Sequence, residues 1–134
     1  MSVLSILPPS RPLLMDGAMG TELMAILPIP GRCPELANVE HPEAVQAVHR
    51  DYYAAGADAV STNSFGGSPL KLETAGLGSR TRELNAAAAR MAASVRPPGK
   101  FVAGDIGPTG KFLKPQGPYD EEEFESGFAV QAEG

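Results

Sequence analysis

The chain has 134 residues, enough for one ordinary domain, and 43% of them are hydrophobic, so it can bury a core. Its 11 basic and 16 acidic residues give a formal net charge of −5 with no basic run, which argues against a nucleic-acid or membrane-surface partner. The single cysteine excludes an internal disulfide framework, and no apolar run approaches the ~20 residues of a membrane span. We therefore expect a soluble, cytoplasmic protein.

The first 12 residues differ in character from the rest of the chain. Pro8, Pro9 and Pro12 exclude a helix there, so residues 1–12 are expected to form an irregular lead-in. Residues 13–134 then alternate between short apolar runs and helical patterns, which is typical of a single α/β domain.

Three strand–helix units follow one another in this domain. Each begins with a short apolar run, passes through polar residues or glycine, and leads to apolar residues spaced three and four apart. The long crossovers predict parallel strands joined as right-handed βαβ units. The predicted strands are 13–16, 57–62 and 101–104; the predicted main helices are 42–55, 80–95 and 120–132; a short helical stretch is expected at 68–75 and a Pro- and Gly-rich loop at 28–40.

Two helix starts carry capping signals. Thr21 is expected to cap a short helix at 22–27, with Glu22 near its positive end. Asp120 precedes the last helix and has Glu123 three residues later, which predicts a capping box. These signals indicate where both helices should begin.

Binding chemistry is expected at the ends of the three strands. The predicted strands end at Asp16-Gly17, at Ser61 to Phe65, and at Gly104 to Pro108. Parallel strands share one edge, so these ends should lie together, and ligands bind at the carboxyl ends of strands in βα repeats. The sequence therefore predicts a binding site at this edge.

Several motifs are shared with one protein family. Residues 13–23 read Leu-Leu-Met-Asp-Gly-Ala-Met-Gly-Thr-Glu-Leu, and residues 102–110 read Val-Ala-Gly-Asp-Ile-Gly-Pro-Thr-Gly. Between them, residues 35–66 contain Glu-Leu-Ala-Asn, His-Pro-Glu-Ala-Val, Ala-Gly-Ala-Asp and Thr-Asn-Ser-Phe-Gly in that order, and residues 82–87 fit as well. Together these stretches resemble the homocysteine S-methyltransferase family, most of all the homocysteine-binding module of cobalamin-dependent methionine synthase.

The resemblance implies a fold and an activity. The family fold is a (β/α)8 TIM barrel of ~250 residues, of which this chain would hold the first three βα units. The last helical pattern stops at Gly134, which indicates a cut, so the missing C-terminal part of the barrel is an expected partner. The family transfers a methyl group to the thiolate of homocysteine and forms methionine.

The resemblance also implies a metal that this chain does not hold. The family's zinc is bound by cysteines on later strands and lowers the pKa of the homocysteine thiol. None of those cysteines is present and Cys33 matches no ligand position, so we expect no metal ligand, no catalytic residue and no activity of this chain by itself. These residues do not indicate the methyl donor, which is methylcobalamin or methyltetrahydrofolate, betaine, or S-methylmethionine.

Four candidate substrate contacts lie at the first two strand ends. By resemblance, the Asp16 carboxylate faces the amino group of homocysteine and the Gly17 amide faces its carboxylate, as a zwitterion requires. The alternative for this pair is a plain turn between strand and helix. The Thr62 hydroxyl and the Asn63 amide can hold the amino-acid carboxylate, or can cap the next helix instead.

The third strand end adds two candidates. Gly104 lets the backbone approach a ligand closely and Asp105 can orient the loop, while a turn role for both is equally open. Three further residues have structural interpretations: Phe65 as a packing residue, His49 as a helix-surface residue, and Cys33 as an inert thiol.

Two other functions stay open at this point. A non-catalytic α/β binding module could cradle an anion at helix starts, although the chain has no G-x-G-x-x-G or P-loop pattern. A split enzyme is the other, in which this chain is the structural half and a second polypeptide carries the cysteines. A glycine-rich strand with cysteine beyond Gly134 would favour the methyltransferase.

Overall fold

The computed structural model describes residues 11–28 and 33–134, so most of the expected lead-in lies outside the described residues. Within the described part, no helix combines the length and apolar character that crossing a membrane requires. The elements, in chain order, are α1 (Gly20–Ile26), η3 (Pro34–Leu36), α2 (Ala37–Glu40), α3 (Pro42–Ala54), β1 (Ala59–Ser61), α4 (Pro69–Leu72), η4 (Glu73–Ala75), η5 (Gly78–Arg80), α5 (Thr81–Ser94), β2 (Phe101–Ala103) and α6 (Glu121–Glu133).

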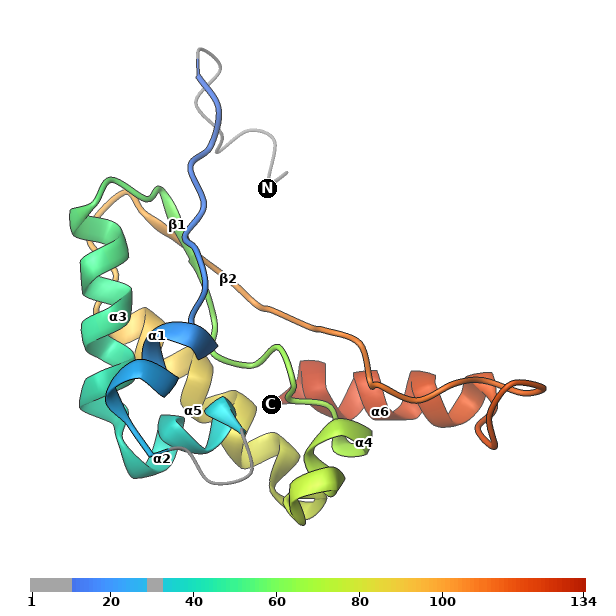
Figure 1. Ribbon diagram of the computed structural model, residues 1–134. Helices are drawn as coiled ribbons and strands as arrows, with labels where there is room; N and C mark the ends of the chain where they lie inside the picture. Colours follow the sequence, from blue (N-terminus) through green and yellow to red (C-terminus); the bar gives the residue numbers. More distant parts are fainter. Residues whose placement is uncertain (1–10, 29–32) are drawn as a thin grey trace.

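Three parallel segments form the sheet region (Figure 1). β1 pairs with β2, and Met15 adds one parallel bridge to Ala59 on the other side of β1. The predicted parallel, adjacent arrangement is confirmed, but a full strand at 13–16 is wrong. Pro12 comes directly before this segment and β1 is its one pairing partner among the described residues, so the ladder stays at a single bridge. The register pairs Ala59 with Phe101, Val60 with Val102, and Ser61 with Ala103.

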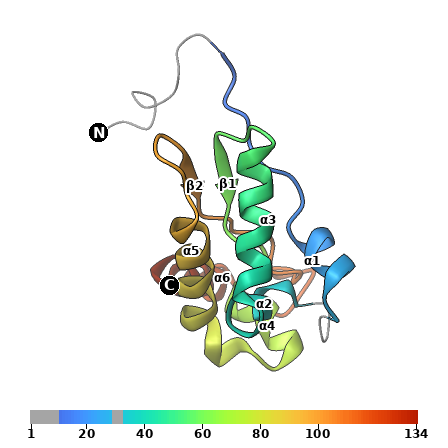
Figure 2. The same cartoon turned by 90° about the vertical axis from the view of Figure 1, so that its left-hand side faces the viewer.

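Two helices supply the apolar cover of the strands. α3 lies along β1 and α5 along β2 (Figure 2). Val60 of β1 is fully buried between Tyr53 of α3 and Ala92 of α5. A second cluster joins Leu23 of α1 to Val45 of α3. The three-and-four spacing that predicts α3 and α5 therefore produces the faces that cover the strands.

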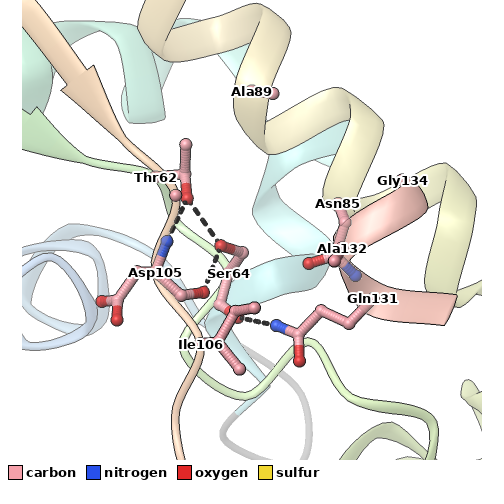
Figure 3. Close-up of a pocket in the computed structure, with 10 residues that line it drawn as sticks. Thr62, Ser64, Asn85, Ala89, Asp105, Ile106, Gln131, Ala132 and Gly134 are labelled. Carbon is pink, nitrogen blue, oxygen red and sulfur yellow. Dashed lines mark hydrogen bonds between the residues drawn. The ribbon is translucent and has the colours of Figure 1, made fainter. Parts of the chain in front are cut away.

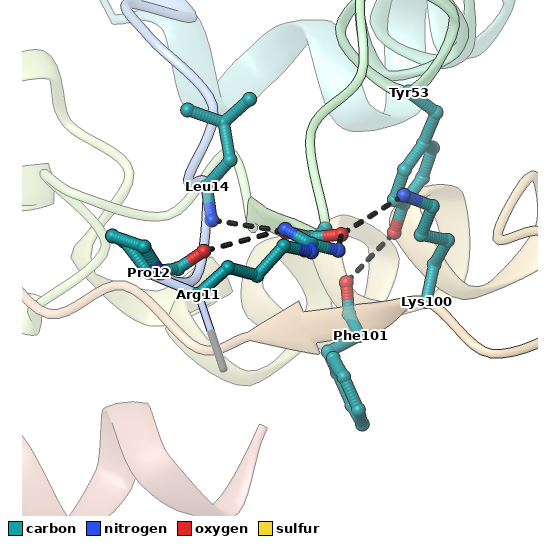
Figure 4. Close-up of polar contacts among 7 residues, drawn as sticks. Arg11, Pro12, Leu14, Tyr53, Lys100 and Phe101 are labelled. Carbon is teal, nitrogen blue, oxygen red and sulfur yellow. Dashed lines mark hydrogen bonds and ion pairs between the residues drawn. The ribbon is translucent and has the colours of Figure 1, made fainter. Parts of the chain in front are cut away.

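A charged cluster joins the amino ends of the three segments (Figure 4). Asp58, which is 5% exposed, accepts hydrogen bonds from the Arg11 guanidinium at 2.5 and 2.8 Å, from Lys100 Nζ at 3.1 Å and from the Leu14 amide at 3.0 Å. These donors, the Arg11 guanidinium first, hold the pKa of the Asp58 carboxyl well below its usual range. The cluster thus fixes the segments at the edge opposite to the predicted site.

The chain between α1 and α3 differs from its prediction. α1 begins at Gly20 with Met19 as its N-cap, and no side chain caps it, so the prediction that Thr21 caps this helix is wrong. The loop expected at 28–40 is helical from residue 34 onward, where Pro34 stands at the start of η3, a position that tolerates proline. Residues 29–32 of that loop lie outside the described residues.

The last helix begins as predicted. Asp120 Oδ1 accepts the Glu123 amide at 3.1 Å, and Glu123 Oε2 accepts the Asp120 amide at 3.0 Å, which confirms the capping box. α6 contacts α4 and α5 (Figure 1). Its final turn brings Gln131 to the segment after β1.

Candidate functional site

Asp16 lies at the carboxyl edge of the three segments, directly after the Met15 bridge. Its Oδ2 accepts the Ser61 amide at 2.8 Å and its Oδ1 accepts the Ser61 hydroxyl at 3.1 Å. The Asp16 amide donates to the Ala59 carbonyl at 3.1 Å. Backbone and side chain are therefore both tied to β1, and the half-buried carboxylate has a fixed orientation before any ligand arrives.

Gly17 is required by the close approach of Tyr52. A Cβ at position 17 would lie 2.8 Å from Tyr52 Oη, which itself donates to the Ala18 carbonyl at 2.9 Å. The Gly17 amide donates no hydrogen bond within residues 11–28 and 33–134. The sequence pair Asp16-Gly17 thus presents one fixed carboxylate beside one N–H donor that has no acceptor among the described residues.

Thr62, Ser64 and Asp105 form a closed hydrogen-bond network (Figure 3). Thr62 Oγ1 accepts the Asp105 amide at 3.0 Å and lies 2.6 Å from Ser64 Oγ, which donates to the Asp105 carbonyl at 2.8 Å. The Thr62 hydroxyl therefore gives its proton to Ser64. In this arrangement Thr62 fixes the backbone of Asp105, so its hydroxyl is already used within the protein.

The Asn63 side chain is bonded to the segment that contains η3 and α2. Its Nδ2 donates to the Pro34 carbonyl at 2.8 Å and to Asn38 Oδ1 at 2.9 Å, and Asn38 Nδ2 donates back to the Asn63 carbonyl at 2.8 Å. Asn63 and Asn38 are both buried. The two N–H groups of the Asn63 amide are therefore occupied by the η3–α2 segment.

Asp105 brings a second carboxylate to the site. Burial raises the pKa of its carboxyl, and the negative charge of Asp16 raises it further. Gly104, just before it, is exposed, and a Cβ at position 104 would meet no atom within 4 Å. Two carboxylates whose charges disfavour each other give this edge a preference for a cationic group.

A small pocket lies between the segments that follow β1 and β2, α5 and the end of α6 (Figure 3). It has a volume of about 140 Å³, and Thr62, Ser64, Asp105 and Gln131 are among its lining residues. Gln131 Nε2 donates to the Ser64 carbonyl at 2.8 Å, and its buried Oε1 has no partner among the described residues. α6 therefore reaches the loop of the candidate site through one side chain.

Some residues were missed or misread from the sequence. Ser61, which holds Asp16, follows the strand pattern, but only the pairing register reveals its role. Phe65 is 58% exposed and its ring lies against Gly107, so its interpretation as a packing residue, not a ligand contact, stays a prediction. His49 is completely buried, so its placement on the helix surface is wrong. The buried residues of α3 include His49 and Tyr53, which lie beside the row that the apolar spacing predicts.

Cys33 is held in a protonated state. Its thiol donates to Glu35 Oε2 at 3.3 Å, and burial together with the Glu35 charge raises the pKa of the thiol to about 11. Within residues 11–28 and 33–134, no three His, Cys, Asp or Glu side chains are grouped as metal ligands would be. A buried, neutral thiol is a poor zinc ligand, so the donor set present does not fit zinc.

The family model of homocysteine S-methyltransferase matches residues 13–134. The chain belongs to this family. Methionine synthase of Mycobacterium tuberculosis (strain ATCC 25618 / H37Rv) is 36% identical over 111 residues, which are 73% of this chain and 9% of that relative. The homocysteine S-methyltransferase of Escherichia coli K12 is 35% identical over 119 residues, which are 75% of this chain and 36% of that relative.

A solved structure of a homocysteine methyltransferase has the same arrangement. The metallated form of MmuM from Escherichia coli matches with a TM-score of 0.74 and 26% sequence identity, over 92% of this chain and 50% of that chain. The α/β fold with parallel strands is therefore that of half of a homocysteine methyltransferase. The chain spans about a third or less of the length of both relatives.

Proposed function

We propose that this chain forms the part of a homocysteine S-methyltransferase that holds the amino-acid end of homocysteine. The observation that carries the proposal is Asp16, whose carboxylate is fixed by Ser61 at the carboxyl edge of parallel strands, beside the Gly17 amide. A zwitterionic amino acid needs one anion and at least one N–H donor in this relation. Family membership names homocysteine as the amino acid.

The proposed architecture is a (β/α)8 barrel of which this chain supplies the first three βα units. Three parallel segments in the order 13–16, β1 and β2, with α3 and α5 along them, agree with such a beginning. The match to half of the MmuM chain supports it. The remaining units would close the sheet and come from the rest of a longer protein or from a second chain.

The residues of this chain bind the amino-acid end of the substrate and orient it. Asp16 takes the substrate ammonium, Gly17 takes its carboxylate, and Thr62 keeps Asp105 in place so that its charge adds to that of Asp16. In the family, zinc supplies the acidification of the substrate thiol. The donors present here do not fit zinc, so metal binding and the methyl donor belong to other parts, and the chain is inactive by itself.

Asp16→Asn tests the proposal directly. The amide keeps the shape and one acceptor for Ser61 but removes the charge, which leaves the substrate ammonium desolvated and unpaired, at a cost of about 2–5 kcal/mol. Thr62→Ala should weaken homocysteine binding by only about 0.5–1.5 kcal/mol, because the neutral Thr62 hydroxyl acts on the substrate only by holding the Asp105 backbone. Calorimetry with homocysteine measures both, with each variant made in the complete, zinc-loaded protein that contains this chain. If Asp16→Asn binds homocysteine as the parent does, Asp16 is a turn residue and the assignment fails.

A further inference from the structure

Glu35 is a buried acid next to the loop of the candidate site. It lies in η3 with 5% of its surface exposed, and its Oε1 accepts the Gly66 amide at 2.6 Å. Its Oε2 accepts the Cys33 thiol at 3.3 Å. No ion pair to Glu35 exists in the described part of the chain. One N–H and one S–H donor, and no cation, therefore compensate the burial of this carboxylate.

The loop between β1 and α4 approaches the Glu35 carboxylate closely at Gly66. A Cβ at position 66 would lie 2.7 Å from Glu35 Oε1, so glycine lets the loop approach the carboxylate without displacing either. Hydrogen bonds from backbone N–H groups to a carboxylate are short and strong. The neighbouring Phe65 carbonyl accepts the Gly107 amide at 2.9 Å. Glu35 thus fixes the β1–α4 loop, residues 62–68, where it meets the segment after β2.

This loop connects both candidate carboxylates. Ser61, directly before it, holds Asp16 with two hydrogen bonds. Ser64, two residues before Gly66, donates to the Asp105 carbonyl at 2.8 Å. A loop released at Gly66 would therefore loosen the supports of Asp16 and Asp105 together.

We propose that Glu35 is a positioning residue of the homocysteine site, an inference that rests on the proposed function. It acts on the substrate through the Gly66 amide and the β1–α4 loop, which orient Asp16 and Asp105. The property that the loop needs is a hydrogen-bond acceptor in this buried place. A neutral acceptor of the same length therefore suffices.

Three variants and one matched control test the role. Glu35→Ala removes the acceptor, Glu35→Gln keeps one, and Gly66→Ala places a methyl group against the Glu35 carboxylate, so that the carboxylate and the loop must separate. Asp58→Asn is the control, because Asp58 is equally buried and also accepts a backbone amide, but lies at the opposite edge of the strands. The dissociation constant of homocysteine is measured by calorimetry, and hydrogen exchange of residues 62–68 and thermal unfolding are measured beside it.

Glu35→Ala and Gly66→Ala should weaken homocysteine binding about tenfold or more and speed exchange in residues 62–68, because a misplaced charge loses most of its contact energy. Glu35→Gln should restore binding to within about threefold of the parent, since one amide oxygen replaces one carboxylate oxygen. Asp58→Asn should lower the melting temperature and leave the dissociation constant unchanged.

Three results would overturn the inference: parent-like binding by Glu35→Ala, a Glu35→Gln variant as weak as Glu35→Ala, or an Asp58→Asn variant that weakens binding equally. If Glu35→Ala does not fold, the homocysteine dissociation constants of Gly66→Ala and Glu35→Gln are compared instead. Equal values for these two variants would then overturn the inference. Unchanged exchange in residues 62–68 rejects the contact between Glu35 and the loop. Absence of homocysteine binding by the parent, measured in the complete, zinc-loaded protein that contains this chain, instead rejects the proposed function, so the two failures are distinguishable.

Discussion

At the scale of single residues, the molecule buries two titratable groups in opposite ways: Asp58, just before β1, is charged, and His49, in α3, is neutral. Asp58 is buried as an ion with three donor residues around it. His49 is buried with neither ring nitrogen bonded to any described residue. Burial lowers the pKa of His49 from 6.5 to about 4, although the charge of Asp16 raises it. His49 is therefore neutral in the folded protein at neutral pH.

The neutral state of His49 makes stability depend on pH. Above pH 6.5 His49 is neutral in both the folded and the unfolded chain, so its protonation does not change the free energy of unfolding there. As the pH falls from 6.5 toward 4, only the unfolded chain takes up the proton, so stability falls by about 2–3 kcal/mol. His49→Leu should remove this part of the pH dependence, measured as urea unfolding between pH 7.5 and 4.5.

Asp58 provides the internal reference for that measurement. Its folded pKa is depressed, so its stabilisation is present above the ordinary carboxyl pKa and is lost only as the pH falls below it. The two groups therefore act in different pH ranges. A parent protein whose stability is flat between pH 6.5 and 4.5 would show that His49 has a partner in solution, such as a buried water.

At the scale of elements, the sequence predicts helices well and their connections poorly. α3, α5 and α6 agree with the predicted helices to within one residue at each end, because apolar spacing and caps are local signals. Residues 34–40 are helical although their composition is that of a loop. Their buried Glu35 and Asn38 bond to the β1–α4 loop, about 30 residues away, and no local pattern encodes that contact.

In the candidate site, too, some residues could be predicted from the sequence and others could not. The position of Asp16-Gly17 and Thr62 at the carboxyl ends of the strands could be predicted from the βα repeats, and their contact with a substrate stays a prediction. Their supports, Ser61 and Gln131, depend on register and on the packing of α6, which spacing along the chain does not give. The sequence thus yields the residues at the edge and misses those that hold them.

A substitution of Asn63 tests whether this residue contacts the substrate or only supports the fold. Asn63→Ala leaves the buried Pro34 carbonyl and Asn38 Oδ1 without a donor, which should lower the free energy of unfolding by about 1–3 kcal/mol. The change is measured by urea unfolding at neutral pH. Thr74→Ala is the control, because its hydroxyl bonds to Lys71 at an exposed position and should change stability little. A stable Asn63→Ala variant with weakened homocysteine binding would instead make Asn63 a substrate contact.

At the scale of the whole molecule, the sheet region has two open edges. β1 pairs with both neighbours, whereas the Met15 segment and β2 pair only with β1 among the described residues. Parallel strands are normally covered on both faces, whereas Leu14 and Met15 of the first segment stay exposed. The proposed barrel accounts for both features, because its further strands would continue the sheet. Within residues 11–28 and 33–134, the exposed large apolar residues are Leu14, Met15, Met24, Ile26, Phe65, Ile106 and Phe112.

Zinc content is the whole-molecule property that separates this part from a complete enzyme. The chain has one cysteine and two histidines, and a tetrahedral site needs three or four ligands. Cys33 precedes η3, while His41 caps α3 and His49 lies two turns further along that helix. The Cys33 thiol has its pKa raised to about 11 and His49 is completely buried, so neither is offered to a metal. Residues 1–134, purified and dialysed with excess zinc, should hold far less than one equivalent by metal analysis, and Cys33→Ser should not change that value. Stoichiometric zinc that Cys33→Ser abolishes would place Cys33 in a metal site and contradict the division of the barrel proposed for this chain.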